Sequence, residues 1–432
     1  MKTSDESSRR TEAPLTVEAA LALLFDRVAL DVLDSEQVPV EQAIGRVLAE
    51  AGRARWPLPN APTSIMDGYA VRSSDLVVAR DEHQAETLAL ELASESAAGH
   101  PSAAALEPGT CARIATGAVV PAGADAVVPQ EDTRRIDVGA RTLIELSSVA
   151  LAQVAPGRWV RPIGSDVRQD DALLEPGELI GGGEASLLAG TGNFEVLVRR
   201  RPKVAILSSG DELVAIGQTP GRGQVVSTNA MLLAAQIREA GGEPCDLGVV
   251  ADTHAALRGA IEQAIETADI LVASGGISVG DHDLTLPVLR ELGLELGFRK
   301  VELRPGRPTT FGVLPRARAP LPVLALPGNP ASTLVAFELF VRPLIRAMLG
   351  LPRARWFRPR RTVELASEAE GDRRREHWIR ARLDEAGRAV PLPKQLSGAL
   401  RSIAGFDALV RIPAGRETVA AGDRLEAMIV RE

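Results

Sequence analysis

The stretch from Ser274 to Asp283 combines three kinds of residue that together could bind a phosphorylated ligand and a cation. Its glycines leave backbone amides open to an anion, because glycine has no Cβ, and its serines add hydroxyl donors. Its aspartates could hold a divalent cation. The residues concerned are Ser274, Gly275, Gly276, Ser278, Asp281 and Asp283. Taken alone, the stretch is better explained as a tight turn whose aspartates cap the next helix.

Two other segments carry related chemistry. Asp211 and Glu212 form a pair of acids in the segment Ser208-Ser-Gly-Asp-Glu-Leu213. The segment Leu326-Pro-Gly-Asn-Pro-Ala-Ser332 places a helix cap beside free amide groups that could face an anion. Its candidate binding residues are Pro327, Gly328, Pro330 and Ser332.

Three cations precede the last of these segments, namely Lys300, Arg304 and Arg307. Ammonium and guanidinium groups are natural counterparts of a phosphate or an oxyanion. Each segment by itself has a good structural explanation. Acids for a metal, amides for a phosphate and cations for an oxyanion, gathered on one rim, would instead favour a nucleotide-like site.

The stretch from Lys203 to about Gly350 alternates strand and helix patterns, which is typical of a parallel sheet wrapped by helices. In such folds, ligands bind beyond the carboxyl ends of the strands, and the three segments above each follow a predicted strand. We therefore expect them to line one site. The predicted strands are 204–207, 247–250, 270–273 and 323–326, and the predicted helices are 230–240, 255–267, 285–292 and 330–348.

Three polar residues further upstream are weaker candidates. Asp67 lies near the only tyrosine of the chain, Thr116 precedes a glycine, and Asp166 lies in a link rich in proline and glycine. Taken alone, an ordinary turn is sufficient to explain Asp67 and is the better explanation of Thr116, and Asp166 is either catalytic or a turn acid. The sequence around them predicts helices over 17–28 and 40–51 and a small β domain over 86–146. The part from Pro352 onward reads as a second small β domain without a catalytic constellation, and we expect it to be structural or to face a partner.

Composition excludes several classes of protein. At roughly 100 to 200 residues per domain, the 432 residues suggest about three domains. The net charge of -8 argues against a general nucleic-acid surface. The two cysteines, Cys111 and Cys245, form no Cys-x-x-Cys pair, so they suggest neither a disulfide scaffold nor a zinc site. No apolar run approaches the ~18 residues of a membrane span, and we expect a cytoplasmic protein without a membrane partner.

Taken together, the motifs resemble those of the molybdopterin molybdenumtransferase family, which includes MoeA and the gephyrin E domain. The order and rough spacing of the motifs match as well, and the resemblance covers the chain from about residue 14 to its end. The motifs are weak singly but specific jointly. They are Met66-Asp-Gly-Tyr-Ala, Thr116-Gly-Ala, Ser209-Gly-Asp-Glu-Leu, Ser274-Gly-Gly-Ile-Ser-Val-Gly-Asp-His-Asp, Arg304-Pro-Gly-Arg-Pro and Leu326-Pro-Gly-Asn-Pro.

The resemblance implies a multidomain α/β plus β fold in an elongated subunit. Its parts would be a discontinuous helical N-terminal domain (14–55 and 150–200), an inserted small β domain (56–149), a MogA-like parallel-sheet α/β domain that binds molybdopterin (201–350) and a C-terminal β domain (351–432). It also implies a homodimer whose active site lies between the subunits, so that residues near 67 and 116 of one subunit serve a site near 275 of the other.

The implied reaction takes adenylylated molybdopterin and molybdate, releases AMP and leaves molybdenum on the pterin, with Mg²⁺ as the cofactor. Independently of the resemblance, splitting a phosphoanhydride requires neutralised phosphate charge and a positioned attacking oxygen, which these acids, amides and cations could supply. The further partners consistent with such a reaction are molybdopterin adenylyltransferase and molybdoenzyme apoproteins.

The resemblance also assigns roles to residues. The catalytic residues would be Asp67, Thr116, Asp166, Glu212 and Asp283, and the metal ligands Asp211, Asp281 and Asp283. Lys300 and Arg304 would face molybdate. The pterin and phosphate site would be lined by Ser274, Gly275, Gly276, Ser278, Pro327, Gly328, Pro330 and Ser332.

The chain departs from the family pattern at two places. Arg304 and Arg307 stand where the family commonly has lysines, and Asp281-His-Asp-Leu284 replaces Glu-Ala-Asp-Tyr. Because arginine makes planar bidentate contacts, the preference of the site for one oxyanion over another could shift.

Three other functions stay open from the sequence: an adenylylating enzyme of the same pathway, a non-catalytic molybdopterin-binding or anchoring scaffold, and a homologue that inserts tungsten from tungstate.

Overall fold

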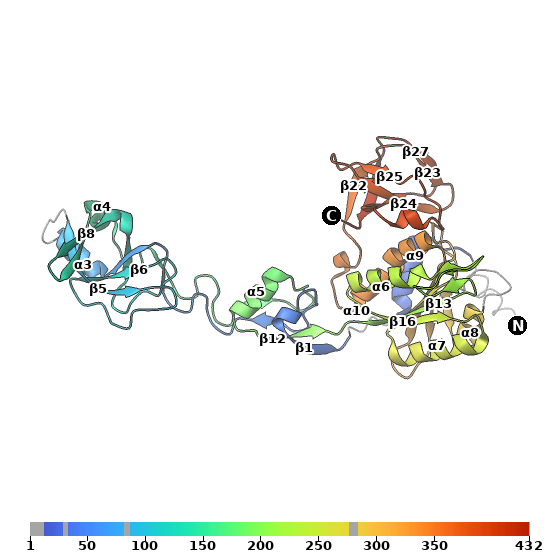
Figure 1. Cartoon of the computed structure of the whole chain (residues 1–432), viewed down its shortest axis with the longest axis horizontal. Helices are drawn as coiled ribbons and strands as arrows, with labels where there is room; N and C mark the ends of the chain where they lie inside the picture. The colour runs from blue at the N-terminus through green and yellow to red at the C-terminus, as the bar shows by residue number, and fades with distance from the viewer. Residues whose placement is uncertain (1–12, 29–32, 82–86, 276–283, 432) are drawn as a thin grey trace.

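The structure is a computed structural model that describes residues 13–28, 33–81, 87–275 and 284–431. Figure 1 shows an elongated chain with a separate β domain at one end, a small body in the middle and a large body at the other end. The large body contains the α/β domain and, stacked on it, the C-terminal β domain. The predicted multidomain α/β plus β class is confirmed.

The α/β domain is built on a six-stranded sheet with the strand order β16-β13-β17-β21-β20-β18. The first four strands pair in parallel, as predicted, but β20 and β18 are antiparallel additions that the sequence did not predict. Both are short and contain a glycine, which weakens a strand pattern. The strands are β13 (Lys203–Ser209), β16 (Glu243–Val250), β17 (Ile270–Ser274), β18 (Glu295–Phe298), β20 (Thr310–Leu314) and β21 (Leu321–Leu326).

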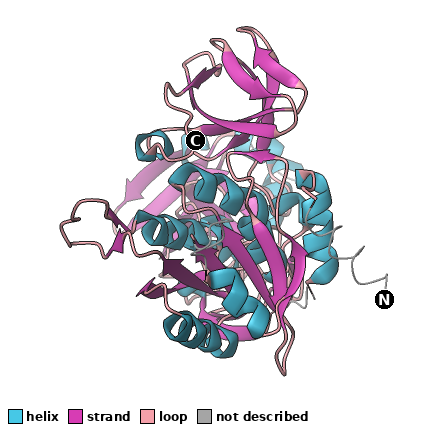
Figure 2. Ribbon diagram, turned by 90° about the vertical axis from the view of Figure 1, so that its right-hand side faces the viewer, coloured by secondary structure: helices cyan, strands magenta, loops and turns pink. Residues whose placement is uncertain are grey.

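Helices cover both faces of this sheet (Figure 2). Successive residues of β17 alternate between two hydrophobic cores: Ile270 and Val272 pack in one, and Leu271 and Ala273 in the other. Strands buried on both faces in this way read as continuous apolar runs. The helices are α6 (Thr228–Ala240), α7 (His254–Thr267), α8 (Thr285–Glu291), α9 (Pro330–Ala336) and α10 (Arg342–Met348). The last two were predicted as one helix, but a π-helical turn at Phe337–Val341 lies between them.

The N-terminal region contains one of its two predicted helices. The helix α2 (Val17–Arg27) is capped by Thr16, and its buried residues share a core with the α/β sheet. The predicted helix over 40–51 was wrong, since the chain forms only a 3-10 turn at Val40–Gln42 there. The reason is Gly45, whose φ of +80° is incompatible with a right-handed helix.

The small middle body is made from two distant parts of the sequence. Strand β1 (Ser35–Pro39) pairs with β12 (Glu195–Arg199), and β2 (Gly52–Arg53) pairs with β11 (Ala172–Leu174). Helix α5 (Gly182–Gly190) packs against them.

The inserted β domain has a six-stranded sheet with the order β7-β4-β6-β5-β9-β8. Helices α3 (Ser73–Asp81) and α4 (Ser148–Gln153) accompany it. Strands β3 (Thr63–Ser64) and β10 (Val160–Arg161) pair at its entry and exit. Its strands are β4 (Gly68–Val71), β5 (Leu88–Ser96), β6 (Thr110–Ile114), β7 (Ala126–Pro129), β8 (Thr133–Val138) and β9 (Arg141–Leu146).

The C-terminal domain is a β domain joined to the α/β domain through strand pairing. Strand β19 (Leu303–Arg304), which precedes β20, pairs in parallel with β24, so Arg304 lies opposite His377. The main sheet has the order β19-β24-β26-β28-β22, and β23 pairs with β27 beside it. The strands are β22 (Arg360–Glu364), β23 (Ala369–Asp372), β24 (Glu376–Leu383), β25 (Ala389–Pro391), β26 (Ala408–Ile412), β27 (Arg416–Val419) and β28 (Arg424–Ile429).

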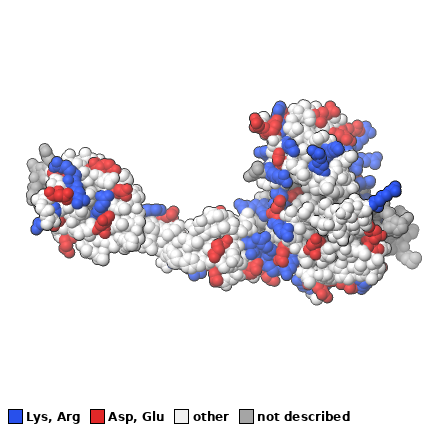
Figure 3. All heavy atoms as spheres, viewed as in Figure 1, with Lys and Arg blue, Asp and Glu red and all other residues white. Residues whose placement is uncertain are grey.

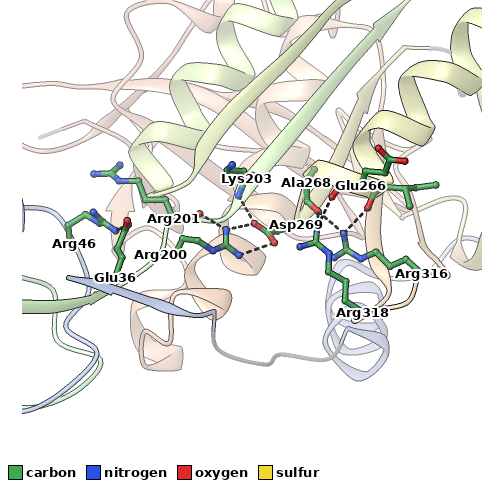
Figure 4. A network of polar contacts seen from close by, with 11 residues as sticks. Glu36, Arg46, Arg200, Arg201, Lys203, Glu266, Ala268, Asp269, Arg316 and Arg318 are labelled. Atoms are coloured by element: carbon green, nitrogen blue, oxygen red, sulfur yellow. Dashed lines mark hydrogen bonds and ion pairs between the residues drawn. The ribbon is translucent and has the colours of Figure 1, made fainter. Parts of the chain in front are cut away.

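A polar network ties the middle body to the α/β domain (Figure 4). The guanidinium group of Arg200 donates to both carboxylate oxygens of Asp269, at 2.8 and 3.1 Å, and the amide of Lys203 donates to Asp269 at 2.7 Å. Beside it, Arg316 and Arg318 both donate to the backbone carbonyl of Ala268, just past the end of α7. The connection between β12 and β13 is therefore anchored at its entry into the sheet.

The surface carries both signs of charge over the large body and the inserted domain (Figure 3). None of the helices within the described ranges is long and apolar enough to cross a membrane.

Candidate functional site

A cavity of about 810 Å³ opens beyond the carboxyl ends of β13, β17 and β21. The ends of these strands are in register, since Ser274 pairs with Ser208 on one side and with Leu326 on the other. The structure thus brings together the three segments that were predicted to share a rim. Of the predicted site residues, Glu212, Ser274, Gly275, Pro327, Gly328 and Pro330 line this cavity.

Local backbone geometry explains the glycine at the end of β17. Gly275 has a φ of +90°, and a Cβ there would lie 2.9 Å from the carbonyl oxygen of Ser209. Only glycine fits without displacing β13, which keeps the turn open beside the cavity. The candidates Gly276, Ser278, Asp281 and Asp283 lie outside the described residues.

Two polar side chains of the cavity were missed from the sequence. The Asn229 amide nitrogen donates to Ser274 Oγ at 2.9 Å and to the Gly328 carbonyl at 2.7 Å, so it fixes two of the loops to each other. Asn229 lies at the start of α6, directly after a short strand, and this position could have indicated from the sequence that it belongs to the site. Ser208 is 1% exposed, and its hydroxyl has no hydrogen-bond partner among the described residues, which leaves it available to a ligand.

Acidic residues gather beside this cavity. Burial, together with the negative charges of Asp211 and Glu212, raises the pKa of Asp252, which follows the end of β16. Asp252 was not predicted, although its place directly after a predicted strand was a usable signal. No group of three or more histidine, cysteine, aspartate or glutamate side chains within the described ranges has the arrangement of a metal site. The predicted metal ligand Asp211 is described, whereas Asp281 and Asp283 are not.

A second cavity, of about 300 Å³, adjoins the first and shares Pro308, Pro327 and Asn329 with it. Its lining contains three arginines, Arg304, Arg307 and Arg375, and the hydroxyl residues Ser332 and Ser397. Lys300 lines neither cavity, and its carbonyl oxygen accepts a hydrogen bond from the amide of Leu15.

The C-terminal domain contributes to both cavities. Arg375 and Ser397 line the second, and Gly398 and Leu400 line the first. The Ser397 carbonyl and hydroxyl oxygens also accept hydrogen bonds at the start of α9. The sequence predicted no catalytic constellation in this domain, and it gave no sign that these residues line the cavities. These residues come near the cavities only through long-range packing, which local sequence patterns do not report.

Asp67 and Thr116 contact each other on the inserted domain. The amide and the hydroxyl of Thr116 donate to one carboxylate oxygen of Asp67, at 2.7 and 2.9 Å. These two bonds lower the pKa of Asp67, and both side chains remain exposed. Within one chain, the inserted domain lies far from the α/β domain (Figure 1). The pair therefore does not reach the cavity of its own chain.

Asp166 lies in the link that returns from the inserted domain. It is exposed, and it lies 3.5 Å from Arg161 in an ion pair. Its amide donates to the carbonyl oxygen of Leu58, which joins the outgoing and returning segments. Within one chain, the structure does not bring Asp166 to the cavity.

We predict that Gly68→Ala destabilises the inserted domain and disturbs Asp67. A Cβ at Gly68 would lie 2.0 Å from the Val128 carbonyl oxygen on the neighbouring strand β7. Overpacking of this kind typically costs about 1 to 3 kcal/mol. Urea unfolding would measure the loss, and Gly259→Ala is the control, because a Cβ at that helical position meets no atom within 4 Å. Equal stability of the two variants would contradict the steric argument.

Comparison with known proteins finds relatives that match this chain over most of its length. Three sequence-family models match: MoeA N-terminal region (domain I and II) over residues 15–192, a probable molybdopterin binding domain over 205–347, and MoeA C-terminal region (domain IV) over 362–430. A molybdopterin molybdenumtransferase from a Nostoc species is 37% identical, covering 90% of this chain and 87% of that protein. Its counterpart from Haemophilus influenzae is 35% identical, with 80% of each chain covered.

Solved structures agree with this similarity. A molybdopterin biosynthesis MoeA protein from Pyrococcus horikoshii has a TM-score of 0.79 and is 32% identical, covering 97% of this chain and 100% of that chain. A second structure of a MoeA protein from the same organism has a TM-score of 0.77 at 26% identity, covering 96% of this chain and 100% of that chain.

Proposed function

Because the chain belongs to the molybdopterin molybdenumtransferase family, an enzyme family of molybdenum cofactor biosynthesis, we propose that it inserts molybdenum from molybdate into adenylylated molybdopterin and releases AMP. One observation carries the proposal: a large cavity lined by loop residues and hydroxyl side chains adjoins a smaller one whose lining includes three arginines, and the two cavities share Pro308, Pro327 and Asn329. The first suits a phosphorylated pterin, and the second suits an oxyanion.

The size and lining of the larger cavity support this assignment. Its 810 Å³ falls within the range of about 300 to 1,000 Å³ that is usual for small-molecule sites. The amides near Gly328 and the hydroxyls of Ser208 and Ser274 can donate to phosphate oxygens. Such fixed donors stabilise negative charge that develops on the phosphates as the anhydride breaks.

The arginine-lined cavity suits molybdate, a doubly charged tetrahedral oxyanion. Guanidinium groups bind such oxygens through paired, charge-assisted hydrogen bonds. Because the two cavities share Pro327 and Asn329, an oxyanion held by Arg304, Arg307 and Arg375 would lie next to a pterin in the larger cavity.

The acids beside the cavity fit a magnesium ion, which prefers carboxylate oxygens. Burial, followed by the negative charges of Asp211 and Glu212, raises the pKa of Asp252, and a cation bound beside these acids would relieve the repulsion between their charges. When bound, Mg²⁺ would neutralise charge on the phosphates of the substrate. We propose Asp211, together with Asp281 and Asp283, as the ligands of this ion.

Release of AMP would be a hydrolysis at the phosphoanhydride. A water oxygen bonds to one phosphorus while the bridging P–O bond breaks, and the bridging oxygen stays with the departing phosphate. The proton of the water needs an acceptor. We propose that Glu212, which lines the cavity, accepts this proton as the general base.

We further propose a homodimer in which Asp67 and Thr116 of one subunit complete the cavity of the other. These residues and Asp166 lie on or beside a domain that stands away from the cavity of its own chain (Figure 1). A second copy related by two-fold symmetry would bring that domain to the cavity. In a cytoplasmic setting, the substrate would come from an adenylyltransferase and the product would pass to molybdoenzyme apoproteins.

The deciding experiment measures AMP release from adenylylated molybdopterin by the purified protein with Mg²⁺, with and without molybdate. We expect molybdate-dependent AMP release together with molybdenum-loaded cofactor. A parallel reaction with tungstate would identify a tungsten-inserting enzyme if tungstate replaced molybdate with a higher kcat/KM. Tight substrate binding without turnover would contradict the proposal and indicate an anchoring scaffold.

A further inference from the structure

The acids of the C-terminal domain hold one edge of Arg304 in the arginine-lined cavity. Arg304 Nη1 lies 3.0 Å from Glu370 Oε1, 3.1 Å from the Gly371 carbonyl oxygen and 3.9 Å from Asp372 Oδ2. Its Nε and Nη2 atoms have no partner among the described residues. This free edge of the guanidinium group can make bidentate contacts with an oxyanion.

Asp372 lies between two of the three arginines. Its Oδ2 atom is 2.6 Å from Arg375 Nη2 and also carries the longer contact to Arg304. Its Oδ1 atom accepts the amides of Arg374 and Arg375, each at 3.0 Å. Both oxygens are thus engaged, and the side chain is 11% exposed.

Glu370 makes a different kind of contact with Arg304. Its side chain is 74% exposed, and among the described residues the carboxylate contacts only Arg304 Nη1. Exposed ion pairs contribute little, about 0.2 to 1 kcal/mol, so an incoming oxyanion can displace this carboxylate from Arg304.

Burial would raise the pKa of Asp372, but hydrogen bonds from the Arg375 side chain and from the amides of Arg374 and Arg375 lower it to about 2. Asp372 is therefore ionised throughout the neutral range.

We propose that Asp372 is a positioning residue that holds Arg304 and Arg375 together for an oxyanion, and that Glu370 competes with the oxyanion for Arg304. The proposal rests on the proposed function only in naming molybdate as the anion. Two guanidinium groups repel each other at close range, and Asp372 offsets that repulsion. Removing its charge would separate the arginines, whereas removing the charge of Glu370 would free Arg304. The two acids therefore have opposite effects on affinity.

The test is calorimetric titration of the purified full-length protein with sodium molybdate. We expect the Kd for molybdate to rise about tenfold in Asp372→Asn, the loss of one charge-assisted contact. We expect it to fall about threefold in Glu370→Gln, in line with an exposed ion pair. The matched control is Asp384→Asn. Asp384 likewise accepts the amide and the side chain of one arginine, Arg388, in the same domain, but it does not line the cavity.

The outcomes separate this inference from the proposed enzyme activity. Opposite shifts in the two variants, with an unchanged control, support the positioning role even if the wild-type protein proves to have no turnover. Weaker binding in both variants would indicate a general structural effect and overturn the inference. An unchanged Kd in Asp372→Asn, or no binding of molybdate to the wild-type protein, would overturn it as well. Thermal unfolding of each variant confirms that the compared proteins are folded.

Discussion

Subunits carrying Asp67→Ala and subunits carrying Glu212→Ala, each inactive alone, are expected to regain about a quarter of wild-type activity when mixed as dimers. Asp67 lies on the inserted domain, and Glu212 lines the cavity of the α/β domain. If the site forms between subunits, a mixed dimer has one site with both residues intact and one with neither. Random exchange makes roughly half of the dimers mixed, and each of these has one working site of two.

The measurement is AMP release by the unseparated mixture after the two variants are unfolded together and refolded. Asp67→Ala mixed with Thr116→Ala is the control, because both residues lie on the inserted domain and contact each other. That mixture regains nothing under our model of the site, since every site receives one damaged inserted domain. Recovery in the control, or none in the first mixture, would place the site within a single chain.

Asp269→Ala is expected to be the most destabilising single substitution that we propose, at about 3 to 5 kcal/mol. Asp269 is 6% exposed and accepts two bonds from Arg200 and one from the Lys203 amide. Its loss leaves a half-buried guanidinium and a backbone amide without their partner at the start of β13. Hydrogen exchange of the amides in β13 and β17 would report this loss locally.

The control for this prediction is Asp137→Ala. Asp137 also bonds an arginine and a hydroxyl, but its side chain is 65% exposed, so we expect a change below about 1 kcal/mol. Similar exchange rates in the two variants would contradict the importance that we give to burial.

The contribution of Asp269 also depends on pH. Burial would raise its pKa, but the hydrogen bonds from Arg200 and Lys203 outweigh burial and hold the pKa below its ordinary value. A carboxylate with a lowered folded-state pKa contributes stability above its unfolded-state pKa and loses it as the pH falls through the folded-state pKa. We therefore expect the difference between wild type and Asp269→Ala to shrink in acid, below about pH 4.

Many residues that line the larger cavity could be predicted from the sequence, because they directly follow apolar runs that are recognisable as strands. Ser274, Gly275 and Gly328 follow apolar runs, and the ends of parallel strands meet at one edge of a sheet. Arg375 could not be found in this way, since it approaches Arg304 only through the pairing of β19 with β24. Asn229 and Asp252 follow strand or turn segments as well, but their roles depend on contacts between loops. The helix predicted over 40–51 failed for a local reason. Its apolar residues have helical spacing, but the backbone conformation of a single glycine, Gly45, prevents a helix there.

The inserted domain and the middle body are joined by two segments that run side by side, with the Leu58 carbonyl bonded to the amides of Asp166 and Val167. A rotation of the middle body about its connection to the α/β domain at Arg200 and Asp269 would carry the inserted domain through a wide arc. A small rotation at this connection becomes a large displacement at Asp67. In the proposed dimer, the accuracy of each catalytic site would depend on the stiffness of a joint in the other subunit, far from any substrate.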